Sequence, residues 1–328
     1  MTEIERGGSD GPEQVPDWAW EVLAHRGGGP VQCEGRVLWA ADQPFGRVDH
    51  GILRVYMPSG DPSTEYYNTI GGAHFHERAA IPYAMTALDT PVYHDYLRKF
   101  SPDNHDLLLV DVGGGDGRNA LPWLRWGFKR VVVVDSTAAA LFRFRARVMA
   151  ENREWLERLV LIECDARTLP LADDTADRVL AIESLYYLNE DYEEGLAQCH
   201  RVMRPQGRLL LADRSYEGAL LTRLLYYGGV GAMLETARSR EMWDGEDGTR
   251  VRTRCFTRSE LHALVAAQGF RILETGGISA FSLLLSFLSK SDGLGPESDA
   301  QLAAVHQLLI SLAHTGRYSR CHVVIAIK

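Results

Sequence analysis

Residues 107–120 read LLLVDVGGGDGRNA, and this stretch decides how the chain folds. Its first residues, LLLV, have the apolar and β-branched composition of a short strand that is buried in a parallel sheet. The glycine cluster that follows can adopt positive φ at low cost, so a ligand can approach the main chain closely there. A helix is expected to begin near Asn119, and its free N–H groups would point at the same place. The stretch therefore predicts a strand, a ligand-binding turn and a helix.

Apolar runs of strand length recur along the rest of the chain, and segments with a helical pattern separate most of them. The seven predicted strands are 107–112, 130–135, 159–165, 176–184, 207–213, 271–277 and 322–328. Strands that alternate with helices at this spacing indicate βαβ units and a parallel sheet. Because the crossovers are right-handed, helices are expected on both faces. We therefore predict an α/β fold with a Rossmann-like, mostly parallel, seven-stranded sheet.

Three segments are expected along the chain. Residues 1–15 are polar and glycine-rich, which predicts a disordered tail. Residues 16–100 are expected to form a small β unit, over 35–57, and an aromatic helical cap, over 59–100. Residues 101–328 would form the main domain. Within it, 214–254 interrupts the strand–helix alternation, so we predict an insertion there that serves as a lid.

Composition and charge exclude several classes of protein. The formal net charge is −9, from 44 acidic against 35 basic residues, which argues against nonspecific binding to nucleic acid or to an anionic membrane. The five cysteines include no CxxC pair, so neither a disulfide framework nor a metal site is predicted. The N-terminus has no signal-peptide core and no apolar run is long enough to cross a membrane, so a cytoplasmic location is expected. A homo-oligomer remains possible.

The spacing of the glycines distinguishes between two kinds of nucleotide ligand. A dinucleotide fingerprint requires G-x-G-x-x-G, but Arg118 stands where the third glycine is needed. The sequence instead has an acid followed by alternating glycines, at Asp111, Gly113, Gly115 and Gly117. This pattern resembles the first motif of the class I S-adenosylmethionine-dependent methyltransferases. The resemblance implies that these four residues hold the methionine and ribose parts of S-adenosylmethionine.

Later segments resemble further motifs of the same family, in the same order. They are VVVVD, CDARTLPLADDTAD, RVLAIESLYYL and RVMRPQGRLLLAD, between residues 131 and 213. The resemblance implies cofactor contacts at the end of each strand. Asp135 and Ser136 would bind the ribose, Asp165 and Ala166 the adenine, and Glu183 and Ser184 would lie beside the sulfonium. Tyr66 or Tyr67 of the cap would contact the methionine end.

The activity implied by the resemblance is methyl transfer to a small organic acceptor, in specialised metabolism. Such a transfer requires alignment, exclusion of water and, for some acceptors, a base. If the acceptor is a hydroxyl, His74, His76, Tyr186 and Tyr187 are the candidate bases. An amine or a carbon acceptor remains an alternative. Two other functions also remain: a cyclase or lyase that uses the same cofactor without methyl transfer, and a scaffold that only binds it.

Overall fold

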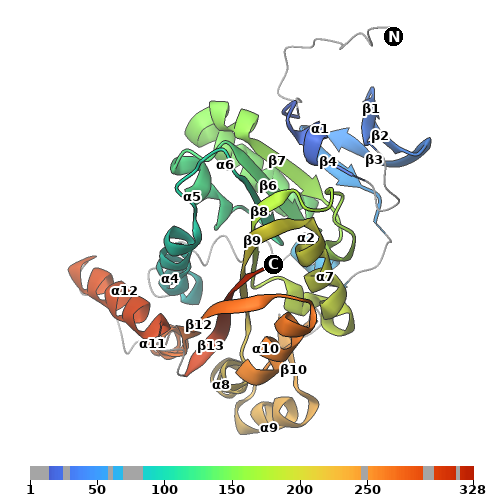
Figure 1. The fold of residues 1–328 in the computed structure, drawn as a ribbon. Coiled ribbons are helices and arrows are strands. Elements are labelled where there is room, and N and C mark those ends of the chain that lie inside the picture. Colours follow the sequence, from blue (N-terminus) through green and yellow to red (C-terminus); the bar gives the residue numbers. More distant parts are fainter. Residues whose placement is uncertain are drawn as a thin grey trace, which may run out of the picture.

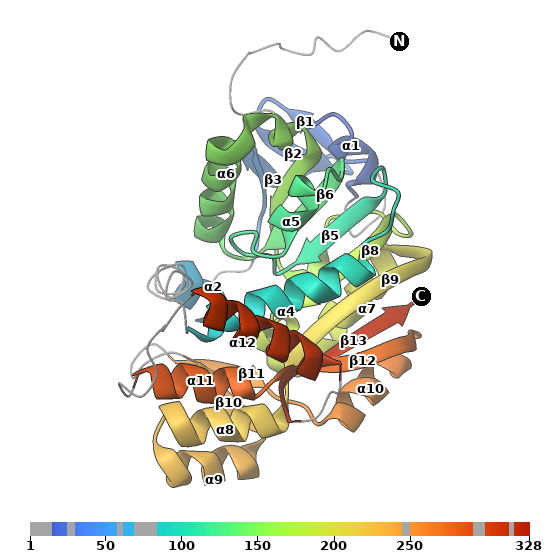
Figure 2. The same cartoon turned by 90° about the vertical axis from the view of Figure 1, so that its left-hand side faces the viewer.

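The computed structural model describes residues 15–24, 30–57, 62–68, 84–244, 250–290, 299–314 and 318–328. Its centre is the predicted α/β sheet (Figures 1 and 2). The seven expected strands are all present: β5 (Leu108–Val112), β6 (Arg130–Asp135), β7 (Leu159–Glu163), β8 (Ala176–Ile182), β9 (Met203–Arg214), β12 (Arg271–Ser279) and β13 (Ser319–Ile327). They lie in the order β7-β6-β5-β8-β9-β13-β12. The fold class predicted from the sequence is thereby confirmed.

Among these seven strands, direction changes only at the side of β13. Neighbouring strands from β7 to β9 run parallel, as the strand–helix alternation predicted. The last strand, β13, lies antiparallel between β9 and β12. The parallel strands therefore all end at the same edge of the sheet, and in an open α/β sheet that edge is where ligands bind.

Four N-terminal strands extend the sheet beyond β7. They are β1 (Gln32–Glu34), β2 (Val37–Ala40), β3 (Gln43–Asp49) and β4 (Ile52–Val55), and neighbours among them pair antiparallel. β4 then pairs in parallel with β7, so the sheet has 11 strands among the described residues. The sequence predicted a small β unit of two or three strands within 35–57, separate from the main sheet, because short-range patterns carry no information about pairing with a strand 100 residues later. The division of the chain into domains stays a prediction.

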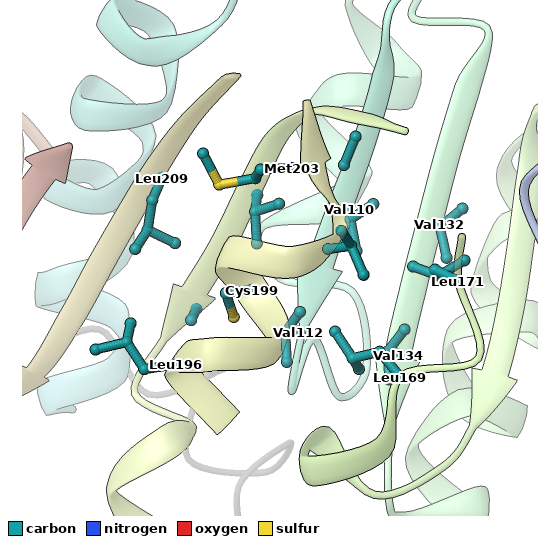
Figure 3. Packing of buried hydrophobic residues seen from close by; sticks show 14 of the residues in the cluster. Val110, Val112, Val132, Val134, Leu169, Leu171, Leu196, Cys199, Met203 and Leu209 are labelled. Atoms are coloured by element: carbon teal, nitrogen blue, oxygen red, sulfur yellow. The ribbon is translucent and has the colours of Figure 1, made fainter. Parts of the chain in front are cut away.

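Helices cover both faces of the sheet and bury its alternating side chains. One face packs against α1 (Ala19–Val22), α7 (Tyr192–Val202) and α10 (Arg258–Ala267). Figure 3 shows part of this cluster, where the side chains of Val110 and Val132 lie with Leu171 and those of Leu196 and Cys199 come from α7. The other face packs against α4 (Met85–Phe100), α5 (Ala120–Arg125), α6 (Ala138–Asn152) and α12 (Asp299–Ala313). Burial on both faces explains why these strands are continuously apolar.

The insertion after β9 differs in detail from its expected form. The sequence of residues 218–234 has the pattern of one helix, but the structure has two, α8 (Tyr216–Tyr226) and α9 (Gly229–Ser239). The break falls at Gly228 and Gly229, which have φ values of 116° and 67° that only glycine adopts readily. The charged stretch that follows contains a hairpin, β10 (Glu241–Asp244) and β11 (Val251–Arg254). Figure 2 shows α8, α9 and α11 (Phe281–Lys290) stacked at one end of the molecule.

Among the described residues, no helix combines the length and the apolar character needed to cross a membrane.

Candidate functional site

A cavity of about 2150 Å³ opens at the carboxyl ends of the parallel strands. Its wall combines the glycine turn with the N-terminal segment, through α2 (Pro62–Asn68), and with the insertion after β9. Pockets for single drug-sized ligands have volumes of roughly 300–1,000 Å³. The cavity therefore has room for a cofactor and a second molecule side by side.

Most of the residues predicted from the sequence lie together in this wall. They are Tyr66, Tyr67, Gly113, Gly115, Asp135, Ser136, Asp165, Ala166, Glu183, Ser184, Tyr186 and Tyr187. Asp111 and Gly117 do not line the cavity. His74 and His76 fall outside the described residues, so their predicted role as bases is untested.

The glycine turn exposes its main chain to the cavity. Gly113 has a φ of 73°, and a Cβ on it would lie 2.2 Å from the Cβ of Ser184. Gly115 has a φ of 54°, and the nearest atom to its would-be Cβ is an oxygen of Asp135 at 3.8 Å, so the space beside it is open. A side chain at position 113 would therefore collide with Ser184, and a side chain at position 115 would fill the open space beside the turn. We call this turn the glycine cradle, because its main chain is accessible to a ligand only when glycines occupy these positions.

Asp111 and Gly117 support the turn from beneath. The side chain of Asp111 is buried, and its Oδ2 has no hydrogen-bond partner. Burial, with the nearby charge of Asp135, raises the pKa of Asp111 to about 7. A Cβ on Gly117 would lie 2.1 Å from the ring of Phe144. Asp111 thus supplies an acidic group under the turn, and Gly117 lets α6 pack closely against the turn.

Asp135 is held at the end of β6 by two main-chain hydrogen bonds. The N–H of Thr137 donates to Oδ1 at 2.8 Å, and the N–H of Gly115 donates to Oδ2 at 2.8 Å. Burial raises the pKa of this carboxyl, and the hydrogen bonds from Thr137 and Gly115 oppose the rise. The side chain of Thr137 also hydrogen-bonds to this carboxylate. Since a carboxylate has about four acceptor sites, Asp135 can still accept a hydrogen bond from a ligand's hydroxyl group.

Asp165 is engaged by a neighbouring arginine. The guanidinium of Arg167 donates to both carboxylate oxygens, at 3.0, 3.0 and 2.5 Å, and its main-chain N–H donates to Oδ1 at 2.8 Å. Arg167 also pairs with Asp191 at 2.5 Å. Asp165 is therefore fixed in the wall beside Ala166 with a neutralised charge, and sequence reasoning did not identify Arg167 as its partner.

Glu183 lies at the end of β8 in a buried charge cluster. Its φ of 53° is rare for a residue with a side chain. Its carboxylate accepts two hydrogen bonds from Arg320, at 3.0 and 2.8 Å, and one from the hydroxyl of Tyr93 at 2.8 Å. Burial alone would raise the pKa of Glu183, but Arg320 together with Arg118 and Tyr93 holds it well below its ordinary value. The guanidinium of Arg118, at the position where a dinucleotide fingerprint has glycine, lies 3.6 Å from this carboxylate.

The same arginine binds a second acid that the sequence analysis did not select. Nε of Arg320 donates to Oδ2 of Asp89 at 2.6 Å, and the Asp89 side chain is fully buried. Ser184, next to Glu183, donates its hydroxyl to the carbonyl of Val112 at 2.8 Å and so ties the end of β8 to β5. Asp89 comes from α4 and Arg320 from β13, and nothing in either local sequence indicates this pairing.

The tyrosines of the wall form a second polar group. The hydroxyl of Tyr187, in the 3-10 helix η3 (Leu185–Asp191), hydrogen-bonds with that of Tyr67 and donates to Oδ2 of Asp244 at 2.9 Å. Arg214 holds Asp244 through two hydrogen bonds, at 2.9 and 2.8 Å, and its guanidinium lies 4.8 Å from the ring centroid of Tyr186. Burial raises the pKa values of Tyr186 and Tyr187 well above that of free tyrosine. Neither phenol is therefore suited to act alone as the predicted base.

The centre of the chain is similar to known methyltransferases. Residues 110–211 match the model of a methyltransferase domain family. The ubiquinone/menaquinone biosynthesis C-methyltransferase UbiE of Paracoccus denitrificans is 35% identical over 119 residues, which is 36% of this chain and 46% of that protein. Methyltransferase GfsG of Streptomyces halstedii is 35% identical over 136 residues, 42% of this chain and 48% of that protein. The chain thus spans about half the length of these relatives.

Another relative is named for a rifamycin substrate. The 27-O-demethylrifamycin SV methyltransferase of Amycolatopsis mediterranei is 33% identical over 106 residues, 32% of this chain and 38% of that protein. Among solved structures, the [4+2]-cyclase SpnF superimposes with a TM-score of 0.54 at 16% identity, covering 83% of this chain and 96% of the cyclase. At this identity the likeness concerns the fold alone.

Proposed function

We propose that the whole protein transfers a methyl group from S-adenosylmethionine to a small organic acceptor, because residues 110–211 match a methyltransferase domain family and their motifs resemble those of the class I S-adenosylmethionine-dependent methyltransferases. The observation that carries this proposal is the open glycine cradle at Gly113 and Gly115. It faces a cavity that is large enough for two molecules, at the strand edge where ligands of α/β sheets bind.

The residues around the cradle fit this cofactor. When bound, S-adenosylmethionine supplies an electrophilic methyl group on a sulfonium sulfur. Asp135 would accept hydrogen bonds from the ribose, and Asp165 and Ala166 would border the adenine. Glu183 and Ser184 would lie beside the methionine part. Asp135, Asp165 and Glu183 line this side of the cavity, and beneath the turn the Oδ2 atom of the buried Asp111 has no hydrogen-bond partner.

The remaining wall would hold the acceptor. Part of it comes from α8 and α11, which contribute Thr222, Tyr226, Leu283 and Ser286. The hydroxyl of Tyr226 donates to the carbonyl of Leu283 at 3.0 Å, which joins the two helices at this wall. The mixture of apolar and hydroxyl side chains favours a partly apolar organic molecule. Orientation of such an acceptor against the methyl group, with water excluded, is the main contribution that these residues would make.

Specialised metabolism is the setting that we propose. One relative supports this setting, because the Amycolatopsis mediterranei enzyme is named for a rifamycin. A non-methylating reaction is the second candidate. The resemblance to a cyclase concerns fold only, so no residue of this site specifically favours cyclisation.

Two measurements test the proposal. Isothermal titration calorimetry with S-adenosylhomocysteine should show binding, and Asp135→Ala should weaken it. Asp173→Asn, at an exposed carboxylate outside the cavity, serves as the control. Incubation of the protein with S-adenosyl[methyl-¹⁴C]methionine and an acceptor library should give labelled product and S-adenosylhomocysteine. Release of methylthioadenosine instead would favour the lyase alternative, and absence of binding would refute the proposal.

A further inference from the structure

Four side chains of the cavity wall form a continuous series of hydrogen bonds. They come from four separate elements: Tyr67 from α2, Tyr187 from η3, Asp244 from β10 and Arg214 from β9. Tyr67 bonds to Tyr187, Tyr187 donates to Asp244 at 2.9 Å, and Arg214 donates to both oxygens of Asp244. The side chains of Arg214 and Asp244 are only 10% and 18% exposed. Packing of the two tyrosine rings alone would not require the hydrogen bonds that continue from Tyr187 to Asp244 and Arg214.

The helix that carries Tyr67 is fixed across the cofactor side of the cavity. The hydroxyl of Thr64 donates to that of Ser136 at 2.9 Å, just after β6. The side chain of Asn68 accepts a hydrogen bond from the N–H of Ala139 at 3.2 Å. Tyr67 lies between these two anchors in the sequence. Its phenol is thereby held where the cofactor side of the cavity meets η3.

The hydrogen bonds of this series have a fixed direction. A carboxylate has only acceptor sites, so Tyr187 must be the donor to Asp244. The hydroxyl of Tyr187 then accepts from Tyr67, which leaves the oxygen of Tyr67 with acceptor capacity. The phenolic protons of Tyr67 and Tyr187 therefore both point toward Asp244, and the carboxylate of Asp244 is the group that can take up a proton.

The two phenols remain protonated in this environment. Burial, followed by the negative charge of Asp244, raises the pKa values of Tyr67 and Tyr187 above that of free tyrosine. A phenol with a raised pKa can pass a proton on, but it does not itself store the negative charge of a base. This explains how a predicted catalytic tyrosine and the missed residue Asp244 would act together.

We propose that Tyr67, Tyr187 and Asp244 form a proton relay that deprotonates a hydroxyl group of the acceptor during methyl transfer. This inference rests on the proposed function and specifies its acceptor atom as oxygen. Tyr67 is the catalytic residue because its hydroxyl would contact the substrate. Tyr187 and Asp244 act through it, and Arg214 positions the carboxylate.

The proposed transfer is balanced in atoms and in charge. The acceptor oxygen forms its bond to the methyl carbon as the carbon–sulfur bond breaks, and the electron pair of that bond stays on sulfur. The acceptor's proton passes to the oxygen of Tyr67, the proton of Tyr67 to Tyr187, and that of Tyr187 to Oδ2 of Asp244. The positive charge of the sulfonium and the negative charge of the carboxylate are lost together, so the net charge of the site does not change, and the guanidinium of Arg214 stays charged beside the protonated acid.

Several charged and titratable groups surround Asp244 and bear on its protonation. Arg214 reaches it from β9, and Tyr187 from η3, with Tyr186 and Tyr67 behind Tyr187. Arg250, just before β11, also lines the cavity. Thr253 of β11 accepts a hydrogen bond from Arg214 at 3.2 Å. The pH test below therefore replaces Asp244 alone and leaves these neighbouring groups in place.

The test uses simple phenols as probes: hydroquinone, catechol and 1-naphthol. The nitro analogue of the accepted probe, largely ionised at pH 8, is the comparison because it needs no base. In Tyr67→Phe, Tyr187→Phe and Asp244→Asn, we expect kcat with the protonated phenol to fall by roughly 100-fold or more. With the nitro analogue the loss should stay below about 10-fold, and affinity for S-adenosylhomocysteine should stay within about two-fold. The residual rate of Asp244→Asn should rise about tenfold per pH unit, because only ionised acceptor reacts.

Tyr216→Phe is the matched control. Its hydroxyl donates to the carbonyl of Ala237 at 3.3 Å, within the insertion but outside the cavity wall. Unchanged rates in the three relay variants would overturn the relay. Methylation of amine or carbon acceptors only would also overturn it. The proposed methyltransferase function would survive both results. Equal losses with both phenols, accompanied by weakened S-adenosylhomocysteine binding, would show a purely structural contact and also overturn the relay. Failure of the wild type to bind S-adenosylhomocysteine would refute the proposed function itself.

Discussion

Glu183 and Arg320 form a two-fold hydrogen-bonded ion pair, with Nη1–Oε2 and Nη2–Oε1 distances of 3.0 and 2.8 Å. Arg320 is only 6% exposed and also binds Asp89, which is fully buried. Removal of Arg320 would leave the fully buried carboxylate of Asp89 without its counter-charge, and Glu183 with only Arg118 at 3.6 Å. A buried carboxylate without a partner is costly, whereas an exposed ion pair contributes little.

We therefore expect Arg320→Gln to lower the free energy of unfolding by about 3–5 kcal/mol in chemical denaturation. The matched control is Arg125→Gln, which breaks a surface pair with Glu151 at 2.6 Å. Since those side chains are 48% and 31% exposed, its cost should be about 0–1 kcal/mol. Equal effects of the two substitutions would contradict the importance of the buried cluster.

Asp111 should make the stability of the ligand-free protein depend on pH. Its pKa in the folded state is about 7, raised above the value of 3.8 for a free aspartate, so the folded state binds this proton more tightly than the unfolded state does. Its contribution is therefore complete below pH 3.8 and is lost as the pH rises through 7, by at most about 1.4 kcal/mol per pH unit. Asp111→Asn, which mimics the protonated acid, should gain stability relative to the wild type between pH 5 and 8. Thermal melts across this range, with Asp173→Asn as the control, would measure the difference, and a constant difference would argue against it.

Gly117→Ala should disturb the packing of α6 against the turn. The new Cβ would lie 2.1 Å from the ring of Phe144, and the φ of 78° is unfavourable for alanine. We expect a loss of about 2–4 kcal/mol in the free energy of unfolding. Phe144→Leu should be less harmful in the Gly117→Ala background than in the wild type, because it creates space for the methyl group. Gly231→Ala is the control, since a Cβ there has no neighbour within 4 Å and alanine favours the helix.

Asp135→Asn should weaken the binding of S-adenosylhomocysteine by about 10- to 100-fold. The reason is that hydrogen bonds to a charged carboxylate contribute about 1.5–3 kcal/mol, and the amide offers only one acceptor oxygen. Calorimetry gives the affinity directly, and a melting curve without ligand shows whether the variant is folded. An affinity within two-fold of the wild type in a folded variant would remove Asp135 from the cofactor site.

The sequence was informative wherever local pattern determines structure. The apolar runs before Asp111, Asp135 and Glu183 predicted buried parallel strands, and the position of Asp135 and Glu183 at strand ends placed these two acids at the cavity. Asp111 lies beneath the glycine turn instead. The spacing of the glycines, with Arg118 in place of the third glycine, also argued against a dinucleotide ligand.

What the sequence did not reveal depends on contacts between distant segments. Arg320 and Asp89 are separated by more than 200 residues, and each lies in an otherwise apolar or ordinary stretch. Asp244 belongs to a strand of four residues in a highly charged segment, which is too short for a period of two to be recognised. Its link to Tyr187 and Tyr67 therefore required the structure.

The parallel pairing of β4 with β7 has a consequence for synthesis on the ribosome. Ile52 and Leu161 are register partners, so the first four strands complete their sheet only after about 110 more residues have been made. Until then the β4 edge presents unpaired N–H and C=O groups, and such edges promote aggregation. Because contacts between distant residues form slowly, expression at lower temperature or with a chaperone should raise the yield of folded protein more than changes near the cavity would.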